Sequence, residues 1–172
     1  NAKIQGHIEE LLVSPLSEIS IVIGYLAGGI IRGLAVATVV TFIALFFTEI
    51  NIKNPLMTLF VIIMTAGVFS LAGLINAIFA KKFDDIAVIP SFVLAPLTYL
   101  GGVFYTVSLL PEFWQTLSRF NPILYMINSM RYSVIGISDV SIQNALMMIV
   151  VFFILLFATA VILLKKGIGI RQ

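Results

Sequence analysis

The residues of this chain that could carry out acid–base, nucleophilic or metal chemistry are few and scattered. There is one histidine, His7, and no cysteine, so the chain offers no thiolate nucleophile and no set of several metal ligands. The patterns HExxH, GxSxG and the P-loop are absent, which argues against zinc hydrolase, serine hydrolase and nucleotide-binding sites. We therefore expect no catalysis in the enzymatic sense from this chain.

The acidic residues lie away from the positions where a proton relay would need them. Pumps and transporters driven by protons commonly carry Asp, Glu or His within a membrane span. Here Glu49 and Asp139 lie at the edges of apolar runs, and Asp84 and Asp85 lie in a short charged turn. If the chain transports a solute, we expect the energy to come from another subunit.

Arg32 is the one charged residue inside an apolar run. At the bilayer centre an arginine costs roughly 2.5–3.5 kcal/mol on insertion scales. If the lipid-facing part of its helix begins near Ala27, Arg32 lies only about 7–8 Å inside, and its side chain can snorkel to the headgroups. Two interpretations stay open: a snorkelling or ion-paired structural residue, which we favour, and a residue that faces a substrate.

The composition is that of a membrane protein. The chain of 172 residues is 60% hydrophobic and 10% charged, with a mean hydropathy of +1.14, whereas soluble domains carry about 25% charged residues. The net charge of +2 is too small to indicate a nucleic-acid partner. The chain begins at Asn1 with a polar stretch instead of a signal peptide, so we expect the C-terminal part of a longer membrane protein.

Four apolar runs are long enough to cross the bilayer hydrocarbon, for which about 20 helical residues suffice. Their approximate bounds are residues 19–47, 56–80, 86–105 and 142–164. The first contains two small-xxx-small spacings, Gly24 to Gly28 and Gly29 to Gly33, which let helices approach closely. The alternative is that glycine is simply common in membrane helices.

Basic residues near the ends of the runs predict the orientation. One side collects six of them: Lys3, Lys81, Lys82, Lys165, Lys166 and Arg171. The other side collects three: Lys53, Arg119 and Arg131. The richer side is predicted to be cytoplasmic, which places both termini in the cytoplasm and residues 105–139 outside.

Two segments outside the apolar runs predict further helices. Residues 3–15 have apolar side chains at helical spacing, and they present Glu9 and Glu10 away from that face. Because membrane-surface helices usually carry basic residues on their polar face, a protein partner fits better than lipid. In 105–139, Pro111 and Pro122 each fall in the first turn of a short aromatic-rich helix, and Asn121 is suited to cap the second. A re-entrant pair and an amphipathic helix on the bilayer surface fit equally well.

Three stretches resemble the permease subunits of bacterial ABC-2-type transporters, in the drug- and polysaccharide-export branch. Residues 6–15 resemble the family's cytoplasmic GxxEELLVSP-type coupling segment, and residues 96–105 resemble the end of its fifth helix. The family's external pattern before the last helix is matched by Pro111, Trp114, Asn121, Pro122, Tyr125 and Arg131. Between its Tyr and Arg the family usually has an acidic residue, where this chain offers Asn128 as a hydrogen-bonding replacement.

The resemblance implies an all-α integral membrane fold with four of the six transmembrane helices of an ABC-2 permease. A cytoplasmic coupling helix would cover 3–15, and a short external re-entrant pair would precede the last span. The resemblance also implies a multi-pass protein of the bacterial inner membrane with a cytoplasmic C-terminus. Its partners would be a second permease copy, a cytoplasmic P-loop ATPase that binds the ATP and Mg, and the lipid bilayer. This chain would bind no cofactor.

The function implied is ATP-driven export of an amphipathic, drug-like, lipid or glycan substrate. The residues implied to couple to the ATPase are Glu9, Glu10, Leu11, Leu12, Ser14 and Pro15. Those implied for the substrate path or external gate are Phe104, Tyr105, Trp114, Asn121, Pro122, Tyr125 and Arg131. The alternatives are a structural or assembly membrane protein whose external segment binds a partner, and an intramembrane enzyme, which the missing catalytic groups disfavour.

Overall fold

The computed structural model of the chain describes residues 17–49, 51–80 and 83–167, and within these ranges it is helical without a strand. Three helices are long and apolar enough to cross a membrane: α2 (Glu18–Ala44), α3 (Pro55–Phe79) and α8 (Ile142–Lys166). The predicted all-helical fold is thus confirmed for the described residues. The first apolar run ends as a helix at Ala44, three residues earlier than predicted. The predicted helix at 3–15 lies outside the described residues.

The third apolar run forms a broken helix. It consists of α4 (Phe83–Ile89), a π-helical turn (Pro90–Leu94) and α5 (Ala95–Leu100). Proline lacks the N–H that an α-helix needs and its ring displaces the preceding turn, so Pro90 and Pro96 account for the irregularity. The three pieces together are about 27 Å long at about 1.5 Å per residue, slightly less than the roughly 30 Å of bilayer hydrocarbon. The four-span count therefore stays a prediction.

The broken helix also ends five residues before the predicted limit at residue 105. Gly101 follows its last residue, and Gly102 adopts a φ of +76°. This left-handed conformation favours glycine and turns the chain away from the helix. Residues 101–105 are mostly apolar, which is why hydropathy alone extended the run.

Two helices lie within residues 105–139, the segment predicted to be external. They are α6 (Glu112–Arg119) and α7 (Pro122–Ile135), preceded by a 3₁₀ turn at Val107–Leu109. The side chain of Asn121 accepts a hydrogen bond of 3.0 Å from the backbone N–H of Ile123, which confirms it as the cap of α7.

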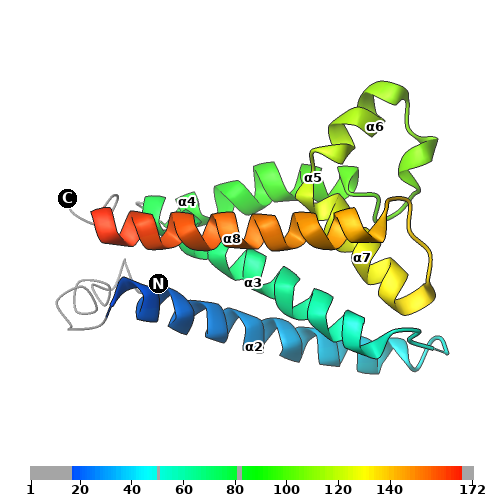
Figure 1. Cartoon of the computed structure of the whole chain (residues 1–172), viewed down its shortest axis with the longest axis horizontal. Coiled ribbons are helices and arrows are strands. Elements are labelled where there is room, and N and C mark those ends of the chain that lie inside the picture. The colour runs from blue at the N-terminus through cyan, green and yellow to red at the C-terminus, as the bar shows by residue number, and fades with distance from the viewer. Residues whose placement is uncertain (1–16, 50, 81–82, 168–172) are drawn as a thin grey trace.

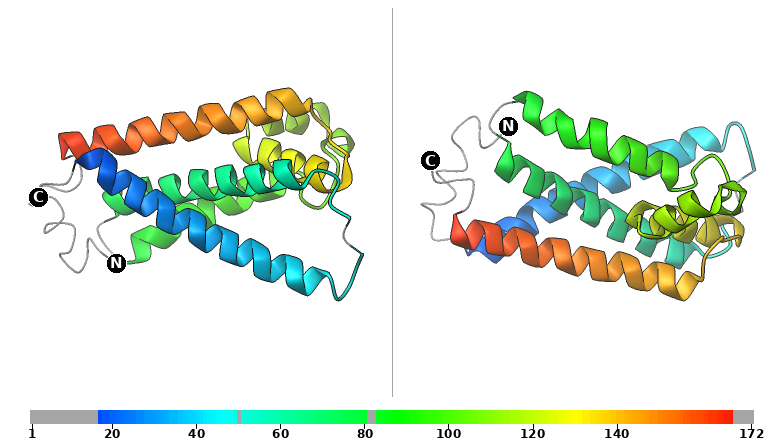
Figure 2. Two further views of the ribbon diagram at one scale, coloured as in Figure 1. Left: turned by 60° about the horizontal axis from the view of Figure 1, so that its bottom comes forward. Right: turned by 90° about the horizontal axis from the view of Figure 1, so that it is seen from above.

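The helices lie along one long axis (Figure 1). The beginning of α2, the beginning of α4 and the end of α8 lie at one end of the molecule, and α6, α7 and the turn from α2 to α3 lie at the other (Figures 1 and 2). We call this second group the cap. Near the first end α2, α3 and α8 share a cluster of buried residues, listed here: Val22, Leu71, Leu74, Ile78, Ala160, Leu163 and Leu164. Nearer the cap, Val68, Met126 and Ile149 join α3, α7 and α8.

One of the two glycine pairs on α2 packs against α3. A Cβ atom added to Gly33 would lie 2.6 Å from Cβ of Ala66, and one added to Gly29 would collide with the side chain of Ser70. By contrast, a Cβ atom on Gly24 or Gly28 would meet nothing within 4 Å among the described residues. Close helix packing is therefore confirmed for Gly29 and Gly33. The other pair faces open space in the described part of the chain.

Candidate functional site

Two asparagine side chains bind the carbonyl groups that the broken helix leaves without α-helical donors. Because Pro90 has no N–H, the carbonyl of Ile86 one turn earlier loses its usual partner. The Nδ2 atom of Asn76 on α3 donates to that carbonyl at 2.9 Å. At the other end of the broken helix, Nδ2 of Asn121 donates to the carbonyl of Leu97 at 2.5 Å. Side chains of α3 and α7 thereby supply hydrogen bonds to the carbonyl groups of the irregular backbone, and backbone at membrane depth requires such bonds.

Arg131 connects three segments at the cap. Its Nη1 lies 2.9 Å from Oδ2 of Asp139, and its Nη2 donates to the carbonyl of Gly102 at 2.6 Å. Asp139 lies in the turn before α8, and Gly102 follows α5. One guanidinium therefore holds the end of α5 and the start of α8 against α7.

Asn128 positions the acidic partner of Arg131. Its Oδ1 accepts hydrogen bonds from the backbone N–H of Asp139 at 2.8 Å and from Oγ of Ser138 at 3.3 Å. Its Nδ2 donates to the carbonyl of Leu124 at 2.9 Å, and the residue is fully buried. Asn128 is thus the hydrogen-bonding group that the sequence suggested. The carboxylate that pairs with Arg131 comes from Asp139, which sequence reasoning had placed only at the edge of a span.

The turn between α2 and α3 is fastened to the same cap. The backbone N–H of Lys53 donates to Val134 at 3.1 Å, and that of Asn54 donates to Ser133 at 2.9 Å. These bonds reach carbonyl groups near the C-terminal end of α7, which have no partner within their own helix. The segment that leads into α3 is therefore bound to the C-terminal end of α7.

The aromatic residues predicted for an external gate lie at the cap end but in separate contacts. Phe104 is 78% exposed and its ring lies 6.2 Å from that of Tyr99. Tyr105 donates its hydroxyl to the Tyr99 carbonyl at 2.6 Å. Trp114 packs edge-to-face on its neighbour Phe113, with ring centroids 5.4 Å apart.

The last predicted gate residues lie on α7. Tyr125 donates its hydroxyl to the carbonyl of Arg119, the last residue of α6, at 2.7 Å. Pro122 opens α7, and Asn121 and Arg131 make the contacts described above. Among the described residues, no ring contact or hydrogen bond joins Trp114 to Phe104 or Tyr125.

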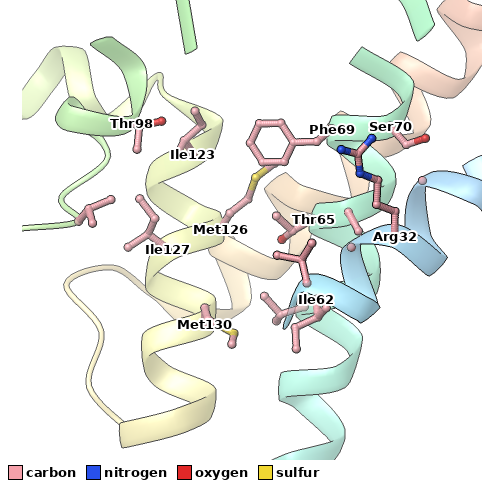
Figure 3. A pocket seen from close by; sticks show the side chains of 16 residues that line it. Arg32, Ile62, Thr65, Phe69, Ser70, Thr98, Ile123, Met126, Ile127 and Met130 are labelled. Atoms are coloured by element: carbon pink, nitrogen blue, oxygen red, sulfur yellow. The ribbon is translucent and has the colours of Figure 1, made fainter. Parts of the chain in front are cut away.

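A cavity of about 740 Å³ lies between α2, α3, α5 and α7 (Figure 3). Its walls are mostly apolar and include Val61, Phe69, Met126 and Ile127. Arg32 is the only charged residue of the described part that lines it. Volumes of 300–1,000 Å³ are usual for small-molecule sites. Sequence reasoning missed this cavity because its walls come from four separate segments.

Arg32 lies near the middle of α2 and is exposed in the single chain. Gly29 lies against Ser70 and Gly33 lies against Ala66, so Arg32 is level with the middle of α3, which runs from Pro55 to Phe79. Within the described ranges, the guanidinium of Arg32 makes no ion pair or hydrogen bond.

The described residues hold no group of three or more His, Cys, Asp or Glu side chains that would suit a metal ion. The residues predicted to couple to an ATPase lie outside the described ranges; they are Glu9, Glu10, Leu11, Leu12, Ser14 and Pro15.

The comparisons with known proteins point to membrane transport. The sequence profile of the family described as "ABC-2 type transporter" matches residues 2–135. The chain is 48% identical over 171 residues to the inner membrane transport permease YadH of Escherichia coli K12, covering 99% of this chain and 67% of that protein. YadH of Shigella flexneri gives the same values.

A more distant relative is nodulation protein J of Rhizobium leguminosarum bv. viciae, 24% identical over 156 residues, which are 90% of this chain and 60% of that protein. No solved structure matches the chain.

Proposed function

Because the chain belongs to the ABC-2 type transporter family, we propose that it is the membrane-spanning permease subunit of an ATP-driven exporter in the bacterial inner membrane. The observation that carries the proposal is the family match over residues 2–135. The relatives at 48% identity are named inner membrane transport permeases, and three long apolar helices fit a multi-pass protein. The substrate proposed is amphipathic, and it is drug-like, a lipid or a glycan.

The energy is proposed to come from a separate cytoplasmic ATPase that binds the ATP and Mg. Residues 3–15 are the proposed contact, with Glu9 and Glu10 facing the ATPase and Leu11 and Leu12 packing against it. This assignment rests on the resemblance of residues 6–15 to the family's coupling segment. Two permease copies, proposed to be identical, would enclose the substrate path.

The contacts of the cap suggest how movement would reach its outer end. Asn121 and Arg131 tie the end of the broken helix to α7, and Lys53 and Asn54 tie α7 to the start of α3, which packs against α2. A tilt of the long helices would therefore move the cap with them. Phe104, Tyr105, Trp114 and Tyr125 are proposed to close the outer end of the path.

The test is affinity purification of the full-length permease from mild detergent, followed by identification of the proteins that accompany it. We expect a P-loop ATPase in roughly equal amount, and we expect the double change Glu9→Lys and Glu10→Lys to remove it. Glu112→Lys is the control, since it reverses one acidic charge on α6, at the opposite end of the molecule from the beginning of α2 (Figure 1).

Two results would count against the proposal. One is an ATPase that stays bound to the Glu9→Lys/Glu10→Lys variant, which would refute the coupling role. The other is a permease that purifies without an ATPase and stimulates no ATP hydrolysis, which would favour the structural or assembly protein.

A further inference from the structure

We propose that the cavity between α2, α3, α5 and α7 binds an amphiphile with one anionic headgroup. Arg32 would pair with the headgroup, and the apolar walls would hold the hydrocarbon body. The inference rests on the proposed function, because it narrows the chemical class of the exported substrate. The two fail separately, since binding to this cavity is measured without ATP or an ATPase.

The first step is the position of the charge. Arg32 lies level with the middle of α3, between the contacts that Gly29 and Gly33 make with that helix. A charged side chain at such depth is costly unless it pairs, reaches water or binds a ligand. An arginine cannot lower this cost by losing its proton.

The second step is the missing partner. No carboxylate of the described residues lines the cavity, and the guanidinium of Arg32 makes no hydrogen bond within those residues. In the single chain Arg32 is exposed, so its guanidinium is open to a ligand. Charge-assisted hydrogen bonds between a guanidinium and an anion are strong, so an anionic group bound here would supply the partner that Arg32 lacks within the described residues.

The third step is the shape of the space. Figure 3 shows Arg32 on α2 beside Ser70, with Phe69 and Met126 reaching toward each other in the same cavity. Aromatic and methionine side chains suit a flexible apolar ligand, because methionine adapts its shape to what it contacts. One cation among apolar walls is the complement of one anion on an apolar body.

The fourth step is access. A second hollow of about 540 Å³ runs along α2 past Ser20, Gly24 and Gly28, and it shares Gly29 and Arg32 with the main cavity. All residues that line this hollow belong to α2, so it is an open surface groove, and it meets the main cavity at Arg32. A headgroup can therefore reach Arg32 from the end of the molecule where α2 begins.

The test uses the full-length permease in nanodiscs of phosphatidylcholine and a palmitate with a photoreactive diazirine on its chain. Its methyl ester is the uncharged probe. We expect the wild type to bind the acid at least about tenfold more tightly than the ester. Mass spectrometry should locate the labels on residues that line the cavity.

Three variants make the test specific. Arg32→Gln should abolish the preference for the acid over the ester, and Arg32→Lys should keep most of it. Arg119→Gln, which removes a charge from the exposed face of the cap, should leave it unchanged. Equal binding of acid and ester by the wild type, or a preference that survives in Arg32→Gln, would overturn the proposal. Retention in Arg32→Lys guards against a variant that merely misfolds.

Two sources share this chemistry, a bilayer phospholipid and an exported single-chain amphiphile. Adding phosphatidylglycerol to the nanodiscs distinguishes them. Displacement of the labelled acid would identify an anionic bilayer lipid as the occupant. Undiminished labelling would identify the site as one for the substrate.

Discussion

The Nη1 atom of Arg131 lies 2.9 Å from Oδ2 of Asp139, which joins α7 to the turn that leads into α8. The same guanidinium donates to the carbonyl of Gly102 at 2.6 Å. The two side chains of the pair are only 20% and 13% exposed, so water screens their attraction incompletely. One guanidinium therefore contacts the segment after the broken helix and the turn before α8 from its place on α7.

Asp139→Ala should lower the free energy of unfolding by about 1.5–3 kcal/mol, the range for hydrogen bonds to charged groups. The loss arises because Arg131 keeps its bond to Gly102 but loses its carboxylate partner. Thermal unfolding of the full-length permease in detergent measures the change. Glu112→Ala is the control, because Glu112 is exposed on α6 and its side chain makes no ion pair in the described part of the chain. Equal losses in the two variants would contradict the role of the pair.

Gly33→Ala should destabilise the protein by about 1–3 kcal/mol, the usual cost of overpacking. The added methyl group would lie 2.6 Å from Cβ of Ala66, and neither side chain can rotate away. Gly24→Ala is the matched control on the same helix, where the new methyl group meets nothing among the described residues. There the higher helix propensity of alanine should leave stability unchanged or raise it by up to about 1 kcal/mol. Similar effects at the two positions, measured by unfolding in detergent, would disprove the packing difference.

The long helices and the N-cap residue of α7 were predictable from local sequence, whereas the contacts between segments were not. Hydropathy located α2, α3 and α8 to within three residues, because any uninterrupted apolar run of this length folds as a helix in lipid. The pairing of Asn121 with Pro122 marked the start of α7. Local patterns predict neither which glycine pair on α2 faces α3 nor where Arg32 lies, since both depend on how separate helices pack.

The polar contacts that hold the cap show the same division. Pro90 indicates that the carbonyl one turn earlier, that of Ile86, has no backbone donor, and Asn76 is a polar amide in an otherwise apolar run. The hydrogen bond between Asn76 and Ile86 could therefore have been predicted from the sequence. The pairing of Asp139 with Arg131 could not be predicted in this way. Asp139 lies eight residues after Arg131, beyond the end of α7, and only the fold of the intervening turn brings the two together.

Asn76→Leu should cost about 1–3 kcal/mol of stability, because it leaves the carbonyl of Ile86 unpaired at membrane depth. The companion change Pro90→Ala restores a backbone N–H that can bind the same carbonyl. We therefore expect Asn76→Leu to cost less in the Pro90→Ala background, which a double-mutant cycle of unfolding measures. Asn144→Leu is the control, since Asn144 is exposed on α8. Additive effects of Asn76→Leu and Pro90→Ala would show that the amide does not serve the proline break.

The proposed orientation predicts which single cysteines react from outside the cell. These 172 residues contain no cysteine, so an introduced thiol is the only one among them. Glu112→Cys on the cap should react with a membrane-impermeant maleimide in intact spheroplasts, and Lys165→Cys at the end of α8 should react only after the membrane is opened. Phe92→Cys, in the π-helical turn, tests whether the broken helix lies in lipid. Phe92 is 77% exposed in the single chain.

The expectation for Phe92→Cys is no reaction before or after opening, because a thiol in hydrocarbon neither ionises nor meets the reagent. The protein without the introduced cysteine is the control for labelling of any other thiol. The reverse pattern for Glu112→Cys and Lys165→Cys would refute the cytoplasmic C-terminus. Rapid labelling of Phe92→Cys would mean that the broken helix is exposed to water, and that the three long helices alone span the membrane within the described part of the chain.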